Sequence, residues 1–257
     1  MQLIEFYREI SAGIRRDLEK QKKLLPLDSI QELCAAHHRQ HRSLKQALVD
    51  HSGKGVIAGL QKNYPREGWN CGTFDHLAFA QSCEKAGAVA LACNTEKNFF
   101  GGNPSMLTGI THLVKTPVIR WDFLLDAYQI MQTRLWGADA ARIVIRMLDN
   151  LELDTILKNA SQHNIEIIAE ASGIDDIDRL MAAEQSSAAA AILIGEDVTD
   201  SDEFAQMLAK IPHGIPALFA GDNYSFDEIR LVNANGVTLF RKLMHDPDLG
   251  KTIAQIR

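Results

Sequence analysis

The amino-acid sequence predicts an α/β protein: a (βα)8 TIM barrel preceded by an N-terminal helical extension. Short apolar runs alternate with helix-like segments eight times, as βα units do. The runs are continuously apolar rather than alternating, which is typical of parallel strands covered on both faces. An open doubly wound sheet would show the same alternation. Eight units within about 200 residues, with no glycine fingerprint after the first strand, favour a closed barrel.

The strands are expected where the apolar runs lie: Val56–Gly59, Ala88–Cys93, Pro117–Trp121, Arg142–Arg146, Ile165–Ala171, Ala189–Ile194, Pro216–Ala220 and Gly236–Phe240. Capping signals mark several of the helices between them. Asp149 can cap one helix, Ser172 or Gly173 precedes another, and Ser225 opens a third, which carries acidic residues in its first turn.

Residues 1–55 precede the first strand and predict two or three helices, among them Gln2–Lys23 and Leu27–Asp50, with Pro26 between these two. We therefore expect an N-terminal helical extension over residues 1–55, packed on a barrel formed by residues 56–257. Because barrels of about 250 residues are commonly single units, the two parts should form one structural domain.

Composition excludes several classes of function. The chain has 257 residues and a net charge of −6 without a long basic run, so a nucleic-acid partner is disfavoured. No apolar run approaches the roughly 20 residues that span a bilayer, and the N-terminus lacks the parts of a signal peptide. The four cysteines form no CxxC pair. A cytoplasmic protein with no membrane partner is expected, although export by a non-classical route would leave the same sequence.

Two linked motifs resemble a known family. Phe99–Gly102 reads FFGG, and Arg120–Gln129 reads RWDFLLDAYQ. Together they resemble the FFGG…LRKDFIIDPYQ signature of indole-3-glycerol-phosphate synthase, a (βα)8 barrel of tryptophan biosynthesis. Glu84–Leu91 and Gly137–Ala140 are similar to two further family segments, and the resemblance covers nearly the whole chain. It implies helices laid over the barrel mouth, a tendency to be monomeric, and a carboxy-lyase that closes a pyrrole ring on a carboxyphenylamino-deoxyribulose phosphate with loss of CO2 and water.

The resemblance also implies where a site would lie, because barrel chemistry sits at the C-terminal ends of the strands. Glu170 keeps a family carboxylate after the fifth strand, and Phe100 and Phe123, together with Trp121, would form the pocket wall. The remaining family positions carry other residues: Gly59 and Gln61 for a glutamate and a lysine, Trp121 for a lysine, Ile194 for an asparagine, Gly221 and Asp222 in one phosphate turn, and Phe240 and Lys242 in the other.

These substitutions remove the groups that the family reaction needs. Trp121 cannot donate a proton at neutral pH and Gly59 has no side chain, whereas loss of one general acid or base typically costs ~10²–10⁴ in rate. Phe240 and Asp222 would block and repel a phosphate. We therefore expect a barrel that has lost the family activity: a pseudoenzyme or a scaffold repurposed to bind a ligand or protein. The alternatives are altered chemistry centred on Glu170, with Trp121, Arg241 and Lys242, and a working synthase.

Several residues allow two interpretations. Glu170 is either catalytic or paired with Lys62 or Arg146. Trp121 either stacks on a ligand or fills the emptied pocket. Lys62, Arg241 and Lys242, with Arg66, form either an anion site or a solvated rim.

The sequence predicts neither a metal nor a cofactor. His37 and His41 have i, i+4 spacing, but no carboxylate or thiol completes a ligand set, so a solvated helix is expected there. Nothing supplies a base beside Cys71 or Cys93. The partner is a small molecule or protein that the sequence does not identify, and the chain should be a monomer or a weak homo-oligomer.

Overall fold

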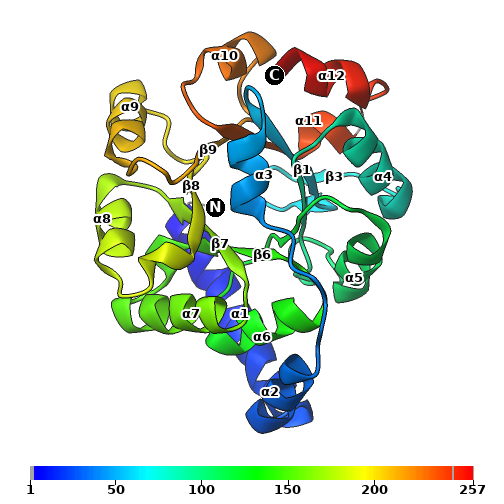
Figure 1. The fold of residues 1–257 in the computed structure, drawn as a ribbon, viewed down its shortest axis with the longest axis vertical. Coiled ribbons are helices and arrows are strands. Elements are labelled where there is room, and N and C mark those ends of the chain that lie inside the picture. Colours follow the sequence, from blue (N-terminus) through cyan, green and yellow to red (C-terminus); the bar gives the residue numbers. More distant parts are fainter. Residues whose placement is uncertain (1–2, 245, 257) are drawn as a thin grey trace.

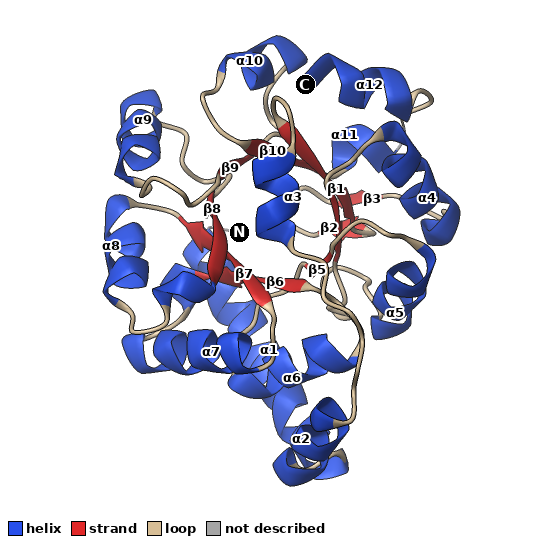
Figure 2. Cartoon of the chain, in the orientation of Figure 1, coloured by secondary structure: helices blue, strands red, loops and turns tan. Residues whose placement is uncertain are grey.

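Eight parallel strands close into a barrel in the computed structural model, which describes residues 3–244 and 246–256. Neighbouring strands pair in the cyclic order β1-β10-β9-β8-β7-β6-β5-β4, and Figures 1 and 2 show the ring nearly end-on. A short antiparallel hairpin, β2 (Asn63–Tyr64) and β3 (Trp69–Asn70), follows the first strand. The barrel strands are β1 (Gly55–Leu60), β4 (Ala90–Cys93), β5 (Val118–Arg120), β6 (Ala140–Val144), β7 (Glu166–Ala171), β8 (Ala189–Ile194), β9 (Ala217–Ala220) and β10 (Gly236–Leu239).

Helices surround the ring and connect its strands (Figure 2). The expected caps at Asp149 and Ser225 are both full capping boxes, and Gly173 precedes its helix without a side-chain bond. The helices after the extension are α4 (His76–Ala86), α5 (Pro104–Leu113), α6 (Ala127–Leu135), α7 (Asn150–Gln162), α8 (Ile174–Ala182), α9 (Ser201–Lys210), α10 (Phe226–Leu231), α11 (Arg241–Met244) and α12 (Leu249–Ile256).

All eight expected strands are present, and the predicted (βα)8 barrel is confirmed. The fourth expected strand differs most in its bounds. It was expected over Arg142–Arg146, whereas β6 starts at Ala140 and ends at Val144, because the chain turns into a short 3₁₀ helix at Ile145–Met147. Arg142 therefore lies inside the barrel wall instead of at the start of a strand.

The expected helix Leu27–Asp50 is wrong as a single element. It divides into α2 (Leu27–Ala35) and α3 (Leu44–Asp50), joined by a segment without regular structure. Two contacts keep this segment from continuing the helix: the Arg42 guanidinium binds Asp139 at 2.5 Å, and Ser43 caps α3. The first expected helix is confirmed as α1 (Leu3–Leu24), with Gln2 outside the described residues.

The N-terminal helices close both ends of the barrel. From α1, Phe6 and Tyr7 reach the cavity at the C-terminal mouth. At the opposite end, Leu44 and Leu48 of α3 pack into the barrel interior, and α3 lies across the opening in Figure 1. Glu166, the first residue of β7, fixes α3 by accepting the Leu44 N–H at 2.5 Å. The α3 side chains fill the N-terminal end of the barrel, whereas a cavity remains at the C-terminal mouth.

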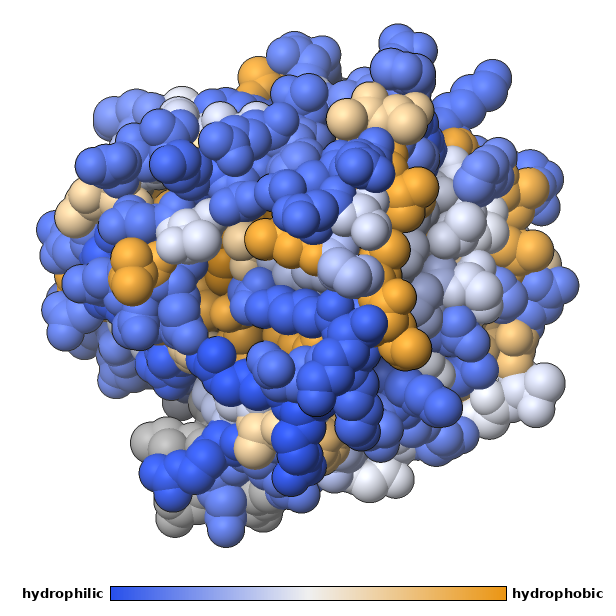
Figure 3. Space-filling model, turned by 90° about the horizontal axis from the view of Figure 1, so that it is seen from below, coloured by the Kyte–Doolittle hydropathy of each residue, from blue (hydrophilic) through white to orange (hydrophobic). Residues whose placement is uncertain are grey.

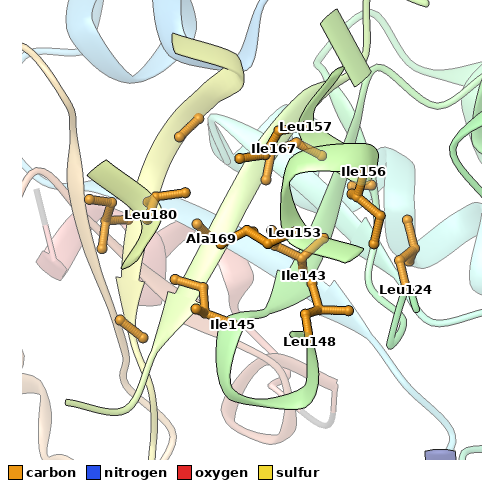
Figure 4. Packing of buried hydrophobic residues seen from close by; sticks show 14 of the residues in the cluster. Leu124, Ile143, Ile145, Leu148, Leu153, Ile156, Leu157, Ile167, Ala169 and Leu180 are labelled. Atoms are coloured by element: carbon orange, nitrogen blue, oxygen red, sulfur yellow. The ribbon is translucent and has the colours of Figure 1, made fainter. Parts of the chain in front are cut away.

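The largest apolar layer lies between the barrel wall and the outer helices α7 and α8. Ile167 and Ala169 face outward from β7 into this layer, where they meet Leu153, Leu157 and Leu180 (Figure 4). Complete burial of each large aliphatic side chain contributes roughly 1.5–3 kcal/mol. Because strand side chains alternate, the even-numbered residues of β7 must face the barrel interior, as Ile168 does. Glu170 is one of those inward residues.

The outer surface shows no single dominant apolar region on the face seen from the α2 end, where hydrophilic side chains surround scattered hydrophobic ones (Figure 3). Leu24, Leu27 and Leu33 are exposed at the junction of α1 and α2. Over the described part of the chain, no helix combines the length and apolar character needed to cross a membrane.

Candidate functional site at the C-terminal mouth of the barrel

A cavity of about 100 Å³ opens at the C-terminal ends of the strands. Most ligand pockets for drug-sized molecules measure ≈ 300–1,000 Å³, so this space is small. Large aromatic side chains occupy much of the mouth. Those that line it come from α1, the β2–β3 hairpin and the loops after β4, β5 and β10: Phe6, Tyr7, Tyr64, Phe100, Trp121, Phe123 and Phe240.

Arg142 and Glu170 form a buried ion pair at the base of the cavity. The Arg142 Nε donates to Glu170 Oε2 at 2.6 Å, and the two residues are 7% and 5% exposed. Their strands are neighbours, and alternation places Arg142 of β6 and Glu170 of β7 on the inner face. Burial alone would lower the pKa of Arg142, but the Glu170 carboxylate raises it above its ordinary value, so the guanidinium stays charged.

The partner of Glu170 is therefore Arg142, and neither expected partner is correct. Arg146 lies beyond β6 and binds Asp197 at 2.8 Å and the Ser172 carbonyl at 3.0 Å. Lys62 has no ion pair with Glu170 within the described residues. Sequence reasoning missed Arg142. The available signal was the alternation of strand side chains: Arg142 stands two residues after Ala140, so both side chains face inward.

Aromatic rings enclose this ion pair. The Arg142 guanidinium carbon lies 5.1 Å from the Trp121 ring centre and 4.7 Å from that of Phe123, which stacks on Phe100 at 5.5 Å. Trp121 is 6% exposed and lies 5.2 Å from the Phe240 ring. The two rings belong to the central apolar cluster of the barrel. Trp121 thus fills volume at the mouth while offering one face to a cation.

Phe240 and Gly59 depend on one another. Gly59 lies on the inner side of β1, and a Cβ atom built there would overlap the Phe240 ring. Any side chain at position 59, a carboxylate included, needs the ring to move. Gln61, two residues further, is buried and donates its side-chain amide to the Asn63 carbonyl at 3.1 Å, so it supports the β2–β3 hairpin.

Asp222 occupies the backbone amides at the end of β10. Its carboxylate accepts the Phe240 N–H at 3.0 Å and the Lys242 N–H at 3.1 Å. Amides of this kind, after the last strands of a barrel and at the start of a short helix, are a common phosphate-binding element. Here a side chain of the protein takes that place. Burial raises the pKa of Asp222 even though these N–H groups act in the opposite direction.

The neighbouring Gly221 offers no additional anion donor. Its N–H donates to the Thr238 carbonyl at 3.0 Å as part of the barrel ladder. A Cβ atom at this position would meet Val237 and Leu239, so the residue packs closely against β10. Gly221 therefore serves the strand ladder and close packing, while Asp222 accepts the Phe240 and Lys242 N–H groups.

The basic residues expected at the rim do not converge on one site. Arg241 binds Glu67 and Asn223 and lies over the Tyr64 ring, whereas the Lys242 ammonium lies 5.6 Å from the centre of Phe226 on α10. Lys62 does not line the cavity. Arg66 does, and its closest carboxylate is Glu196 at 3.6 Å.

Ile194 lies in the outer apolar layer between β8 and the helices, so it does not face the mouth. Glu196, two residues later, lines the cavity. The Glu196 side chain lies at the rim and is 47% exposed; partial desolvation and the nearby Glu170 raise the pKa of its carboxyl, although Arg66 and Arg142 act against this. The residue after β8 that lines the cavity is thus Glu196, an acid that the sequence analysis did not single out.

The histidine segment carries no helical metal site. His37, His38 and His41 lie on the irregular segment between α2 and α3, so i, i+4 spacing does not align His37 and His41. His41 faces Glu166 at 3.8 Å. No group of three or more potential metal ligands occurs over residues 3–244 and 246–256. Cys71 and Cys93 are buried thiols whose burial raises their pKa.

The internal carboxylate leads to a testable expectation. Asp222→Ala leaves the Phe240 and Lys242 N–H groups without their acceptor, which should lower the free energy of unfolding by about 1–3 kcal/mol. Added inorganic phosphate should restore part of that loss by binding the freed amides. Urea unfolding with and without phosphate measures both effects. Asp28→Ala, at an exposed position on α2, is the control. Its free energy of unfolding should stay close to that of the wild type and should not rise with phosphate. A variant as stable as the wild type would contradict the role assigned to Asp222.

Comparison with known proteins places the chain in a family. The family model described as indole-3-glycerol phosphate synthase matches residues 7–184, more than half of the chain. The indole-3-glycerol phosphate synthase of Carboxydothermus hydrogenoformans is 29% identical, over 96% of this chain and 98% of that protein. The one from Koribacter versatilis is 32% identical over 64% of each chain.

Solved structures agree on the fold. The tryptophan synthase alpha chain of Legionella pneumophila superposes with a TM-score of 0.61 at 13% identity, covering 84% of this chain and 96% of that one. A 3-keto-L-gulonate-6-phosphate decarboxylase from Vibrio cholerae also gives 0.61 at 13% identity, over 80% and 96%. At such low identity the likeness concerns the barrel architecture alone.

Proposed function

Because this chain belongs to the indole-3-glycerol phosphate synthase family, we propose that it is a family barrel whose mouth binds a ligand without catalysing the family's ring closure. The observation that carries the proposal is that the protein's own groups occupy the mouth. Asp222 fills the amides suited to a phosphate, and Phe240 fills the space above Gly59.

The chemistry of the remaining groups supports the same proposal. Loss of CO2 and water during ring closure needs a group that protonates oxygen and a group that accepts a proton. Trp121 stands where the family has a lysine, and an indole N–H only donates hydrogen bonds. Glu170 is bound to Arg142 at 2.6 Å, so one of its oxygens is already engaged. Of the family's catalytic positions only this paired carboxylate remains, and alone it does not supply both proton transfers.

Turnover of the family substrate tests the proposal directly. Purified protein incubated with the carboxyphenylamino-deoxyribulose phosphate should form no indoleglycerol phosphate above the buffer rate, measured by the appearance of indole fluorescence. Expression in a tryptophan auxotroph that lacks the synthase should not restore growth. A relative with the full set of family residues serves as the positive control in both assays.

A working indole-3-glycerol phosphate synthase is the second candidate. It is favoured by the family match, by the names of the relatives and by the retained Glu170. Turnover that Glu170→Gln abolishes, in a variant whose circular dichroism matches the wild type, would replace our proposal with this candidate. Turnover that survives Glu170→Gln would indicate altered chemistry that does not depend on Glu170.

A further inference from the structure

The charged groups of the mouth point to the class of ligand, if the cavity binds one as proposed above. Four carboxylates and two guanidinium groups line it. The carboxylates are those of Glu67, Glu170, Glu196 and Asp222, and the guanidinium groups are those of Arg66 and Arg142. The lining is therefore acidic overall, which opposes an anionic ligand and attracts a cation.

The three guanidinium groups at the mouth each lie beside a carboxylate. Arg142 is bound to Glu170, Arg241 to Glu67, and Arg66 lies 3.6 Å from Glu196. The first two pairs are close, whereas the third is too long for a hydrogen bond. Glu196 has no hydrogen bond within the described part of the chain, so its carboxylate is the acid with the least compensation.

Tyr64 provides a buried polar group without a hydrogen-bond partner in the described chain. Its hydroxyl is buried at the mouth, and no hydrogen-bond partner for it occurs among the described residues. Burial raises the pKa of Tyr64, and the nearby Asp222 and Glu196 raise it further, so the phenol stays neutral. A neutral hydroxyl in this environment can accept a hydrogen bond from an ammonium group. An unpaired buried hydroxyl is also unfavourable, which a bound donor would relieve.

The aromatic walls favour the same kind of ligand. Cations are attracted to ring faces within about 6 Å, by roughly 0.5–2 kcal/mol depending on exposure. The protein already uses three rings of this mouth in that way, with Arg142 over Trp121 and Phe123 and Arg241 over Tyr64. Phe240 and Trp121 add apolar surface for the body of a ligand.

We propose that the mouth binds a small organic cation: a primary ammonium group on an apolar or aromatic body. The ammonium group pairs with Glu196 and donates to the Tyr64 hydroxyl, while Trp121 and Phe240 contact the body. No phosphate is part of the ligand, because Asp222 holds the amides that would bind one.

Calorimetric titration of the purified protein with four probes tests this proposal. Three of the probes have a similar size and differ in charge, and the fourth is a simple anion. Phenethylammonium is compared with phenethyl alcohol, which lacks the charge, with phenylacetate, which reverses it, and with inorganic phosphate. Phenethylammonium should bind at least 10-fold more tightly than any of the other three. Tighter binding of phenylacetate or phosphate, or no binding of any probe, would overturn the proposal.

Two variants locate the ammonium group. Glu196→Gln should weaken phenethylammonium binding at least 10-fold, and Tyr64→Phe should weaken it several-fold. Glu184→Gln, exposed and outside the mouth, should bind as the wild type does. Because Glu196 lies at the rim, its variant should keep the unfolding midpoint of the wild type. Wild-type affinity in Glu196→Gln would contradict the assignment. These readouts do not involve turnover, so synthase activity would refute the proposed function without deciding the ligand class.

The pH dependence provides an independent check. The pKa of Glu196, at the rim of the cavity, is raised by partial desolvation and by Glu170 and Asp222, against the influence of Arg66 and Arg142. Phenethylammonium affinity should therefore fall as the pH drops through the raised pKa of Glu196, while the probe itself stays charged. In Glu196→Gln that dependence should disappear. An affinity independent of pH in the wild type would count against a direct contact.

Discussion

Replacing Arg142 with methionine is expected to lower the free energy of unfolding by about 3–5 kcal/mol, because it leaves the Glu170 carboxylate buried without its counter-charge. The pair is nearly inaccessible, and the guanidinium also lies between the Trp121 and Phe123 rings. Urea unfolding followed by tryptophan fluorescence measures the change, and Trp121 lies beside the altered position.

Two further variants separate the loss of the pair from general disruption. Removing both charges in Arg142→Met/Glu170→Leu should recover most of the stability, since apolar replacements of buried ion pairs are often neutral. Arg15→Met is the matched control. Its pair with Glu152 is exposed, at 51% and 26%, so the loss should be about 0–1 kcal/mol. If Arg142→Met costs no more than Arg15→Met, the buried pair does not hold the mouth together.

The barrel could be predicted because each strand is a continuous apolar run that can be recognised from its local sequence. Arg142 could not be interpreted in the same way. A charged residue next to an apolar run normally marks a strand boundary, so the sequence predicted a strand that begins at Arg142. The structure places Arg142 in the middle of β6. Its charge is tolerated there because Glu170, 28 positions further along the chain, compensates it. Such compensation depends on strand register, which no local pattern reveals.

Another difference has the same origin in distant contacts. The break between α2 and α3 has no glycine or proline to mark it, and it is fixed by the pairing of Arg42 with Asp139. A different error concerns Ile194, which was assigned to the mouth because a family asparagine aligns near it. The Ile194 side chain lies on the outer face of β8, and the mouth is instead reached by Glu196, beyond the end of that strand.

The replaced family positions form connected pairs rather than separate losses. Asp222 binds the Phe240 and Lys242 N–H groups, so changes in both phosphate turns meet in one hydrogen-bonded unit. Phe240 in turn lies over Gly59 and against Trp121. Restoring a carboxylate at position 59 would require the removal of Phe240 in the same protein.

This dependence gives the second large expected effect. Gly59→Ala places a Cβ atom inside the Phe240 ring, and overpacking of this kind should lower the free energy of unfolding by about 1–3 kcal/mol. Gly250→Ala on α12 is the matched control, because its nearest neighbour to a new Cβ is Asp248 Oδ1 at 3.7 Å. It should leave stability nearly unchanged or slightly raised, since alanine favours a helix over glycine.

A double-mutant cycle measures the connection between the two positions. Phe240→Ala alone should lower the free energy of unfolding by about 3–5 kcal/mol through lost packing. In Gly59→Ala/Phe240→Ala the new methyl group enters the vacated space, so the combined loss should be smaller than the sum of the single losses by roughly 1–3 kcal/mol. Strict additivity would mean that the ring moves aside freely. In that case Phe240 would not exclude a side chain at position 59, and a carboxylate could return there without any second change.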